Sequence, residues 1–448
     1  MRHDIPRLCI AGASSGSGKT TVSTALLKAL SEKISVCAFK SGPDYIDPMF
    51  HRAALGIPSF NLDLFLMGEE GVKDSLVRYG GGFDMAVLEG AMGFYDGVSF
   101  ENEDLSVCDT CRRLDIPAVL VIDTKGMGHS LMAVIEGFLK LHPNTIKGVI
   151  LNRCKKTTYP RYKAMIEGQT GIKVYGFMPE NGDFTLKSRH LGLVTAEEDA
   201  DLEMRLSGLK DAALECLDLD GILGLARSAP PLEHEPKKIP QLGEFSVAVA
   251  KDRAFCFYYE ENLDILRRLG GKISYFSPLD NEEVPKDADL LLLGGGYPEL
   301  YAERLSENGQ TMKSIREFIT SNGAVFAECG GMMYLGKSID GFPMCGILSS
   351  EFYMTSSLKH FGYGTLCPKE PCLGFEKGET VRCHQFHYSS AEVLGDGFTF
   401  TRPSGSKSLT GFCGENLYAA YPHIHFSGNM NFAMHLAHRA LKHREGVK

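Results

Sequence analysis

Short apolar runs alternate with amphipathic stretches through the first half of the chain. Stretches such as 20–30 and 129–141 show the spacing of helices that pack one face on a core. Strands and helices in alternation form a parallel sheet that helices cover on both faces. The first half is therefore predicted to be an α/β domain, with strands at 7–11, 35–39, 85–89, 118–123, 148–152 and 174–177.

A proline-rich segment follows at 226–243. It holds four prolines and charges of both signs, a composition typical of stiff, solvent-exposed linkers. We therefore expect one domain over 1–225 and a second over 244–448.

The second domain begins with the same alternation and then changes character. Four strands are expected at its start, and 431–442 is expected to be a closing helix. Beyond about residue 352, short β-rich runs predict additional antiparallel strands. The early strands are predicted at 246–250, 273–276, 290–293 and 324–327, and the later ones at 361–366, 381–388 and 417–420.

Composition and charge exclude several classes of protein. The 448 residues carry a net charge of −9, which argues against a nucleic-acid binder. No apolar run approaches the ~20 residues that a membrane-spanning helix needs, and the N-terminus lacks the pattern of a signal peptide. We therefore expect a cytoplasmic protein with no membrane partner. The thirteen cysteines are then expected to be reduced, with Cys108 and Cys111 as helix residues rather than metal ligands.

The strongest motif in the first half is GASSGSGKT at 12–20, between an apolar strand and a helix. Such a P-loop turns main-chain N–H groups around phosphate oxygens, and the helix start adds the positive end of its dipole. Lys19 can then reach the β- and γ-phosphates, and the Thr20 hydroxyl can bind Mg²⁺. In the strict GxxxxGK[ST] spacing, Ala13 stands where the first glycine belongs. The candidate nucleotide-binding residues are Gly12, Gly16, Gly18, Lys19, Thr20 and Thr21.

Carboxylates after two strands can complete a Mg²⁺ site, because Mg²⁺ prefers oxygen ligands. Glu89 ends one predicted strand, and Asp44 and Asp47 follow another. Asp44 is nearer its strand end and is the preferred ligand, together with Thr20 and Glu89. The alternative for each acid is a structural role as a helix cap or turn residue.

Two further polar residues follow strands of the same predicted sheet. Asp96 lies in a glycine-rich loop and is a candidate for orienting a substrate group, or equally a turn residue before Gly97. Asn152 is a candidate for pairing with the nucleotide base, or equally a cap on its strand. Asp44, Asp47 and Asp96 are thus the candidate catalytic acids of this half.

The second domain carries a strand, a cysteine, two glycines and a helix at 324–335. This is the pattern of a nucleophile elbow, in which a sharp turn exposes the sulfur of Cys329 and the helix start favours the thiolate. A thiolate that attacks a carboxamide also needs donors for the oxyanion that forms. Main-chain N–H groups of Gly295 and Gly296, after the strand at 290–293, are the candidates.

Several histidines compete for the role of base. His423 and His425 lie in YPHIHF, where strand alternation predicts that they point to the same side. His384 and His387 are alternative candidates. The residues alone do not rank the four.

Taken together, these segments resemble the cobyrinate a,c-diamide synthase family of cobalamin biosynthesis. The resemblance covers essentially the whole chain and is most specific in GPDYIDP and GGGYPELY. The segments that carry it include FKSGPDYIDPMFH (39–51), LEGAMGFYDG (88–97), RHLGLVTAEE (189–198), GGGYPELY (294–301), ECGGMMYLG (328–336) and AYPHIHF (420–426).

The resemblance implies a dethiobiotin-synthetase-like P-loop domain joined to a class I glutamine amidotransferase domain, which is a flavodoxin-like α/β fold. It implies that ATP and Mg²⁺ phosphorylate the a and c acetate carboxylates of cobyrinate, and that ammonia from glutamine displaces the phosphate. Cys329 is then the nucleophile and His423 its base. Class I glutaminases place a Glu two residues after that base, whereas this chain has His425, so the resemblance assigns no orienting group.

The sequence leaves several alternative functions open. Relatives that amidate nickel-sirohydrochlorin or hydrogenobyrinate share these motifs. A P-loop assembly or partitioning ATPase is an alternative of another class, against which Cys329 argues. A homodimer is a further possibility.

Overall fold

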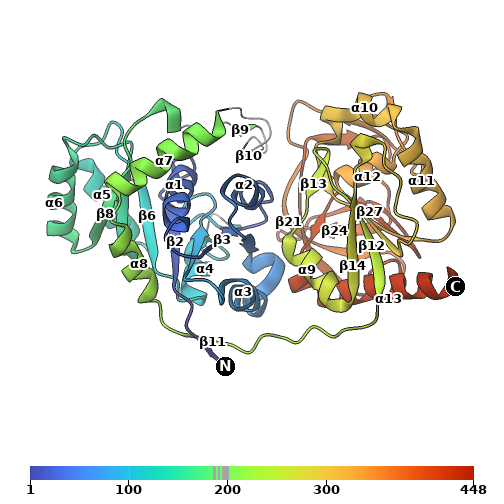
Figure 1. The fold of residues 1–448 in the computed structure, drawn as a ribbon, viewed down its shortest axis with the longest axis horizontal. Coiled ribbons are helices and arrows are strands. Elements are labelled where there is room, and N and C mark those ends of the chain that lie inside the picture. Colours follow the sequence, from blue (N-terminus) through green and yellow to red (C-terminus); the bar gives the residue numbers. More distant parts are fainter. Residues whose placement is uncertain (100, 185–187, 190–191, 194–200, 448) are drawn as a thin grey trace. The chain divides into compact units, whose positions relative to one another are not determined.

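The computed structural model describes the chain except for residues 100, 185–187, 190–191, 194–200 and 448. It divides into two compact units, Met1–Leu64 with Gly68–Lys237, and Phe65–Met67 with Lys238–Lys448 (Figure 1). Most of the segment at 189–198 therefore lies outside the described residues. No helix of the described residues combines the length and apolarity that a bilayer crossing requires.

A seven-stranded sheet forms the centre of the first unit. Every neighbouring pair of strands is parallel, as the alternation predicts. The short edge strand β4 was not predicted, because SFNL is too short and too polar to stand out as an apolar run. Across the sheet the order is β4 (Ser59–Leu62), β3 (Val36–Ser41), β5 (Met85–Glu89), β2 (Arg7–Gly12), β6 (Ala118–Asp123), β7 (Ile146–Asn152) and β8 (Lys173–Phe177).

Helices cover both faces of this sheet, since every residue of β2 and β3 is buried. On one face, Leu8 and Val87 of the strands pack in one cluster with Leu26 of α1 and Leu209 of α7. The helices of the unit are α1 (Lys19–Ser31), α2 (Ile46–Leu55), α3 (Leu64–Gly80), α4 (Val107–Arg113), α5 (Ser130–Lys140), α6 (Tyr159–Thr170), α7 (Leu202–Cys216) and α8 (Leu219–Arg227). Cys108 and Cys111 lie buried in α4, in line with their predicted place in a helix.

The start of the proline-rich segment belongs to the first unit. Strand β11 (Leu232–Glu233) pairs with β1 (Arg2–His3), and the buried Arg7 guanidinium donates to the carbonyl oxygen of Pro230. The ring of His234 lies 2.5 Å from a carboxylate oxygen of Asp74.

A six-stranded sheet forms the centre of the second unit. Strands 417–420 were predicted to be antiparallel additions, but β27 pairs in parallel with β17 in the main sheet. The prediction holds for the pairing of β27 with β26 and is wrong for its pairing with β17, because strand direction depends on the connection before the strand, which the local pattern does not encode. The order is β14 (Gly271–Phe276), β12 (Phe245–Ala250), β15 (Leu290–Leu293), β17 (Ala324–Glu328), β27 (Leu417–Ala420) and β26 (Phe412–Gly414), of which only β26 is antiparallel to its neighbour among the described pairs.

An antiparallel sheet accompanies the main one, as expected from the later β-rich runs. Its order is β25 (Lys407–Thr410), β24 (Phe398–Thr401), β21 (His360–Pro368), β22 (Val381–His387) and β28 (His423–Ile424). A second, smaller sheet joins β19 (Phe342–Pro343), β18 (Ser338–Ile339), β20 (Glu351–Met354) and β23 (Ser389–Ala391), and β13 (Phe255–Phe257) pairs with β16 (Gly295–Gly296).

Helices complete the core of the second unit. Phe432 and Leu436 of the closing helix pack in one cluster with Phe326 of β17 and Phe398 of β24, so this helix joins the two sheets. The helices are α9 (Glu260–Leu269), α10 (Ala302–Glu307), α11 (Gly309–Thr320), α12 (Gly330–Leu335) and α13 (Met430–Val447).

Candidate functional site

The loop between β2 and α1 is closed by main-chain hydrogen bonds. The N–H of Ala13 donates to Val121 at 3.2 Å, and the N–H of Ser17 donates to Ser14 at 3.3 Å. Gly18, at the start of α1, has φ of 90°, and a methyl group there would collide with the side-chain amide of Asn152. The loop therefore has the tight turn and the helix start that a phosphate-binding loop requires.

Asn152 and Arg153 hold this loop from the end of β7. Nδ2 of Asn152 donates to the carbonyl oxygen of Ser17 at 2.9 Å, so this amide supports the loop. That contact comes in addition to the two predicted roles of Asn152, pairing with the nucleotide base and capping its strand. Arg153 has φ of 51° and pairs with Asp123 at 2.5 Å, and its guanidinium lies 3.3 Å from the carbonyl oxygen of Gly16.

Thr20 and Glu89 meet beside the loop, as the Mg²⁺ prediction requires. The Thr20 hydroxyl donates to Oε1 of Glu89 at 2.7 Å, and Lys40 lies 2.8 Å from the same oxygen. Burial by itself raises the pKa of Glu89, but the charge of Lys40 and the contact with His51 outweigh it and hold that pKa well below its usual range. A hydroxyl and an ionised carboxylate are oxygen donors of the kind that Mg²⁺ binds.

Asp44 and Asp47 have different surroundings. Oδ1 of Asp44 accepts hydrogen bonds from the N–H groups of Ile46 and Asp47 at 2.7 and 3.3 Å, so this acid caps the start of α2, the structural alternative to its predicted role as a Mg²⁺ ligand. Asp47 is buried and lies 2.5 Å from Nζ of Lys40. Burial lowers the pKa of Lys40, yet the charges of Asp47 and Glu89 raise it above its usual value, so Lys40 is a buried cation between two acids.

Asp96 lies in a loop that rests on the P-loop. Its Oδ2 accepts a hydrogen bond from the N–H of Gly93 at 2.9 Å, and the N–H of Phe94 donates to the carbonyl oxygen of Gly12 at 2.9 Å. Burial and the neighbouring Lys40 lower the pKa of Lys19, while Glu89, Asp47 and Asp96 oppose that change. Asp47 and Asp96 are therefore close enough to Lys19 to act on its charge.

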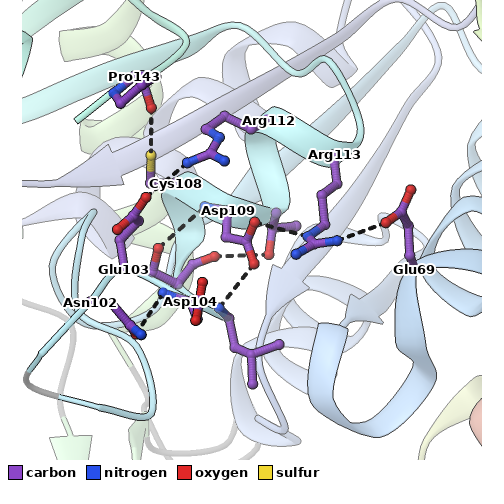
Figure 2. A network of polar contacts seen from close by, with 12 residues as sticks. Glu69, Asn102, Glu103, Asp104, Cys108, Asp109, Arg112, Arg113 and Pro143 are labelled. Atoms are coloured by element: carbon purple, nitrogen blue, oxygen red, sulfur yellow. Dashed lines mark hydrogen bonds and ion pairs between the residues drawn. The ribbon is translucent and has the colours of Figure 1, made fainter.

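A network of hydrogen bonds and ion pairs holds the residues just before and within α4, which follow the loop of Asp96 in the chain (Figure 2). Asp109 accepts a hydrogen bond from the N–H of Leu105 at 3.0 Å and pairs with Arg113 at 2.9 Å, and Arg113 pairs in turn with Glu69 at 2.7 Å. The network fixes Leu105 and the start of α4.

In the second unit, Cys329 occupies the turn between β17 and α12. Its φ of 49° and ψ of −106° are a strained conformation for a residue other than glycine. A methyl group at Gly331 would overlap the carbonyl oxygen of Leu293, which explains a glycine after the cysteine. This is the geometry of a nucleophile elbow.

His423 is the imidazole beside Cys329. It forms a side-chain hydrogen bond with Cys329, and its Nδ1 lies 3.5 Å from Oε2 of Glu328. Burial lowers the pKa of His423, but the contacts with Cys329 and Glu328 and the charges of these two groups outweigh burial and raise it to about 10. A buried thiol and an imidazole in contact can exchange a proton.

The competing histidines lie in other environments. His384 faces His423 across β22 and β28, and burial lowers the pKa of His384 to about 3. His387 stacks on Tyr421 at 3.6 Å between ring centroids, and burial likewise lowers its pKa to about 3. A pKa this low makes each ring a poor proton acceptor, whereas the imidazole in contact with Cys329 is that of His423.

His425 does not share the surroundings of His423. Strand β28 ends at Ile424, so strand alternation does not extend to residue 425. Its Nδ1 accepts a hydrogen bond from the N–H of Ser427, and its ring lies 4.6 Å from that of Tyr259.

The two glycines predicted to donate to the oxyanion lie beside the turn that holds Cys329. Gly295 and Gly296 form β16, so their main-chain groups belong in part to the ladder with β13. A methyl group on Gly295 would lie 2.8 Å from Cε1 of His423, and one on Gly330 would lie 3.3 Å from the amide nitrogen of Gly296. The segment is thus brought to both His423 and the cysteine turn.

Comparisons with known proteins match both units. Residues 8–194 match the CobQ/CobB/MinD/ParA nucleotide binding domain, and residues 246–431 match the CobB/CobQ-like glutamine amidotransferase domain. A protein named cobyrinate a,c-diamide synthase from Thermoplasma acidophilum is 39% identical, covering 96% of this chain and 99% of its own. The chain belongs to the cobyrinate a,c-diamide synthase family. A protein of the same name from Fusobacterium nucleatum is 40% identical, covering 94% and 98%.

Membership of the cobyrinate a,c-diamide synthase family confirms the resemblance and the predicted fold class, a P-loop parallel-sheet domain with a glutamine amidotransferase domain. Among solved structures, PurLQS from Thermotoga maritima overlaps with a TM-score of 0.33 and 15% identity, over 44% of this chain and 98% of that one. That overlap is too weak to support a functional argument.

Sequence reasoning missed three residues at these two sites. Lys40 and Glu328 stood inside quoted motifs, KSGPD and ECGG, but only the tertiary contacts reveal their partners. Arg153 left no signal beyond its position next to Asn152.

Proposed function

We propose that this chain is an ATP- and glutamine-dependent amidotransferase that converts the a and c acetate carboxylates of cobyrinate into carboxamides. The observation that carries the proposal is the presence, in one chain of this family, of a phosphate-binding loop beside Thr20–Glu89 and a separate Cys329–His423 pair. The first site activates an acid, and the second releases nitrogen from glutamine.

At the first site, the loop and Lys19 bind the phosphates of ATP, and Thr20 and Glu89 would hold Mg²⁺. Bound Mg²⁺ would neutralise charge on the transferring phosphoryl group. Asp47 and Asp96 act on the charge of Lys19 and through this cation position the acceptor carboxylate. Phosphorylation gives this carboxylate a leaving group, which ammonia then displaces with release of phosphate.

At the second site, Cys329 attacks the side-chain carboxamide of glutamine. His423 takes the thiol proton and returns it to the departing ammonia. The N–H groups of Gly295 and Gly296 stabilise the oxyanion that forms on the carbonyl oxygen. Water then releases glutamate from the cysteine.

Mass spectrometry of the product tests the proposal. Purified protein is given glutamine, ATP, Mg²⁺ and, in separate reactions, cobyrinate, hydrogenobyrinate or nickel-sirohydrochlorin. Two successive acid-to-amide mass changes on cobyrinate support the proposed substrate, whereas the same changes on another macrocycle alone would reassign it. ATP turnover without any amide product would instead favour the assembly or partitioning ATPase.

The variant Cys329→Ala separates the two sites. We expect it to lose glutamine-dependent amidation and to keep amidation driven by high ammonium. Loss of both reactions in a folded variant would contradict the division of labour. A homodimer and a cytoplasmic location stay predictions of the sequence.

A further inference from the structure

A base that takes a proton at one ring nitrogen needs a partner at the other. The partner fixes which nitrogen carries the proton in the resting imidazole and stabilises the imidazolium that forms. His425, two residues beyond His423, contacts Ser427 and Tyr259 and lies 3.9 Å from Glu261 instead. The side chain at Nδ1 of His423 is Glu328.

The carboxylate of Glu328 is held in place from two directions. Glu328 is the last residue of β17 and directly precedes Cys329. Its Oε1 accepts a hydrogen bond from the N–H of Ile424 at 2.7 Å, and its Oε2 lies 3.5 Å from Nδ1 of His423. Both side chains are about 5% exposed. The backbone of the histidine's own strand therefore anchors the acid beside the imidazole.

We propose that Glu328 is the positioning residue of the glutaminase site, where it holds the Nδ1 proton of His423 and leaves Nε2 to share a proton with the thiol of Cys329. This inference rests on the proposed function and adds the orienting group that position 425 does not supply. One proton is shared between the sulfur and Nε2, and in the charged form of the pair the imidazolium lies between the thiolate and the carboxylate.

The charges around His423 favour this arrangement. His384 and His387 on β22 are neutral at ordinary pH, because burial lowers the pKa of each to about 3. Burial raises the pKa of the groups that surround the acid well above their usual values, so these groups stay protonated; they are Tyr258, Cys383 and Tyr418. Among the described contacts, Glu328 is thus the acid that lies at Nδ1 of His423.

The test is Glu328→Gln, which keeps the size of the side chain and an oxygen that can accept from Ile424. Its amide N–H₂ would donate to Nδ1 and place the resting proton on Nε2, the wrong nitrogen. We expect kcat for glutamine hydrolysis to fall at least about 100-fold with KM for glutamine changed less than about threefold. Amidation driven by ammonium should stay at the wild-type rate.

A second measurement separates positioning from a structural role. The rate of Cys329 alkylation by iodoacetamide, followed on its peptide by mass spectrometry, is recorded against pH. In wild type the rate should stay high to low pH, since the imidazolium stabilises the thiolate; in Glu328→Gln the profile should move to higher pH. Glu328→Asp should restore part of both kcat and the profile, and Glu351→Gln, an exposed acid on β20, should match wild type.

Wild-type kcat and an unchanged alkylation profile in Glu328→Gln would overturn the inference. So would equal loss of glutamine and ammonium activities, which indicates general damage to the fold. If the wild-type protein amidates no tetrapyrrole, the proposed function fails, while glutamine hydrolysis and the alkylation profile still decide the role of Glu328.

Discussion

The buried cation Lys40 provides a sharp test of the first site. Its Nζ lies 2.5 Å from Asp47 and 2.8 Å from Glu89, and its side chain is 5% exposed. The substitution Lys40→Met keeps the aliphatic stem and leaves two buried carboxylates without their cation. Removing one partner of a buried ion pair typically costs about 3–5 kcal/mol. For a unit of this size, that corresponds to a fall in Tm of about 6–20 °C.

Lys140→Met is the matched control. Lys140 also lies 2.5 Å from a carboxylate, that of Glu136, but its side chain is 73% exposed. Exposed pairs of this kind contribute about 0.2–1 kcal/mol, so this variant should unfold close to wild type. Calorimetry of wild type and both variants measures the difference, and equal unfolding temperatures for the two variants would refute the reasoning.

The pH dependence of Lys40→Met has a defined sign. In wild type the pKa of Glu89 is below its unfolded value, so its contribution to stability is present above about 4.5 and is lost as pH falls through the folded value. Without Lys40 that pKa should rise above the unfolded value, because burial then dominates. The stability deficit should therefore be largest at neutral pH and shrink toward pH 5. A deficit that grows on acidification, measured by urea unfolding, would contradict this account.

Three further predictions follow from single contacts. Thr20→Val removes the hydroxyl beside Glu89 and should weaken Mg²⁺ activation about 10- to 100-fold in a titration of ATP-dependent amidation. Asn152→Ala removes the hydrogen bond to the carbonyl of Ser17 and should destabilise the first unit by about 1–3 kcal/mol in thermal unfolding, with a higher KM for ATP. Gly331→Ala should destabilise the second unit by about 1–3 kcal/mol and abolish glutamine hydrolysis, whereas Gly309→Ala, where a methyl group meets nothing within 4 Å, should be neutral.

The sequence predicted the elements that local patterns define. The P-loop context, six of the seven strands of the first sheet and the cysteine elbow all follow from runs of apolar residues, glycines and helix starts close together in the chain. Family membership confirmed the two domain types in their order.

What the sequence did not reveal depends on register between distant segments. The direction of β27 and the end of β28 decide where the two histidines lie, and neither has a local signal. Lys40 and Glu328 are charged residues near the ends of apolar strands. In the sequence, such a charge indicates only where the strand ends and not which residue it pairs with. Their partners appear only when the sheets bring those strand ends together.

The pairing of β17 with β27 also determines how strongly substitutions elsewhere in the second unit affect the glutaminase site. Glu328 and Ala420 are partners in the parallel ladder between β17 and β27, and the N–H of Cys329 donates to the carbonyl oxygen of Ala420 at 2.9 Å. Cys329 directly follows β17, and His423 comes three residues after Ala420, the last residue of β27. The pairing of these two strands therefore brings the sulfur and the imidazole to the same end of the sheet. The two groups could separate only if the buried pairing of β17 and β27 shifted its register. Substitutions on the outer surface should therefore alter the rate of glutamine hydrolysis far less than substitutions at the Glu328–Ala420 pair.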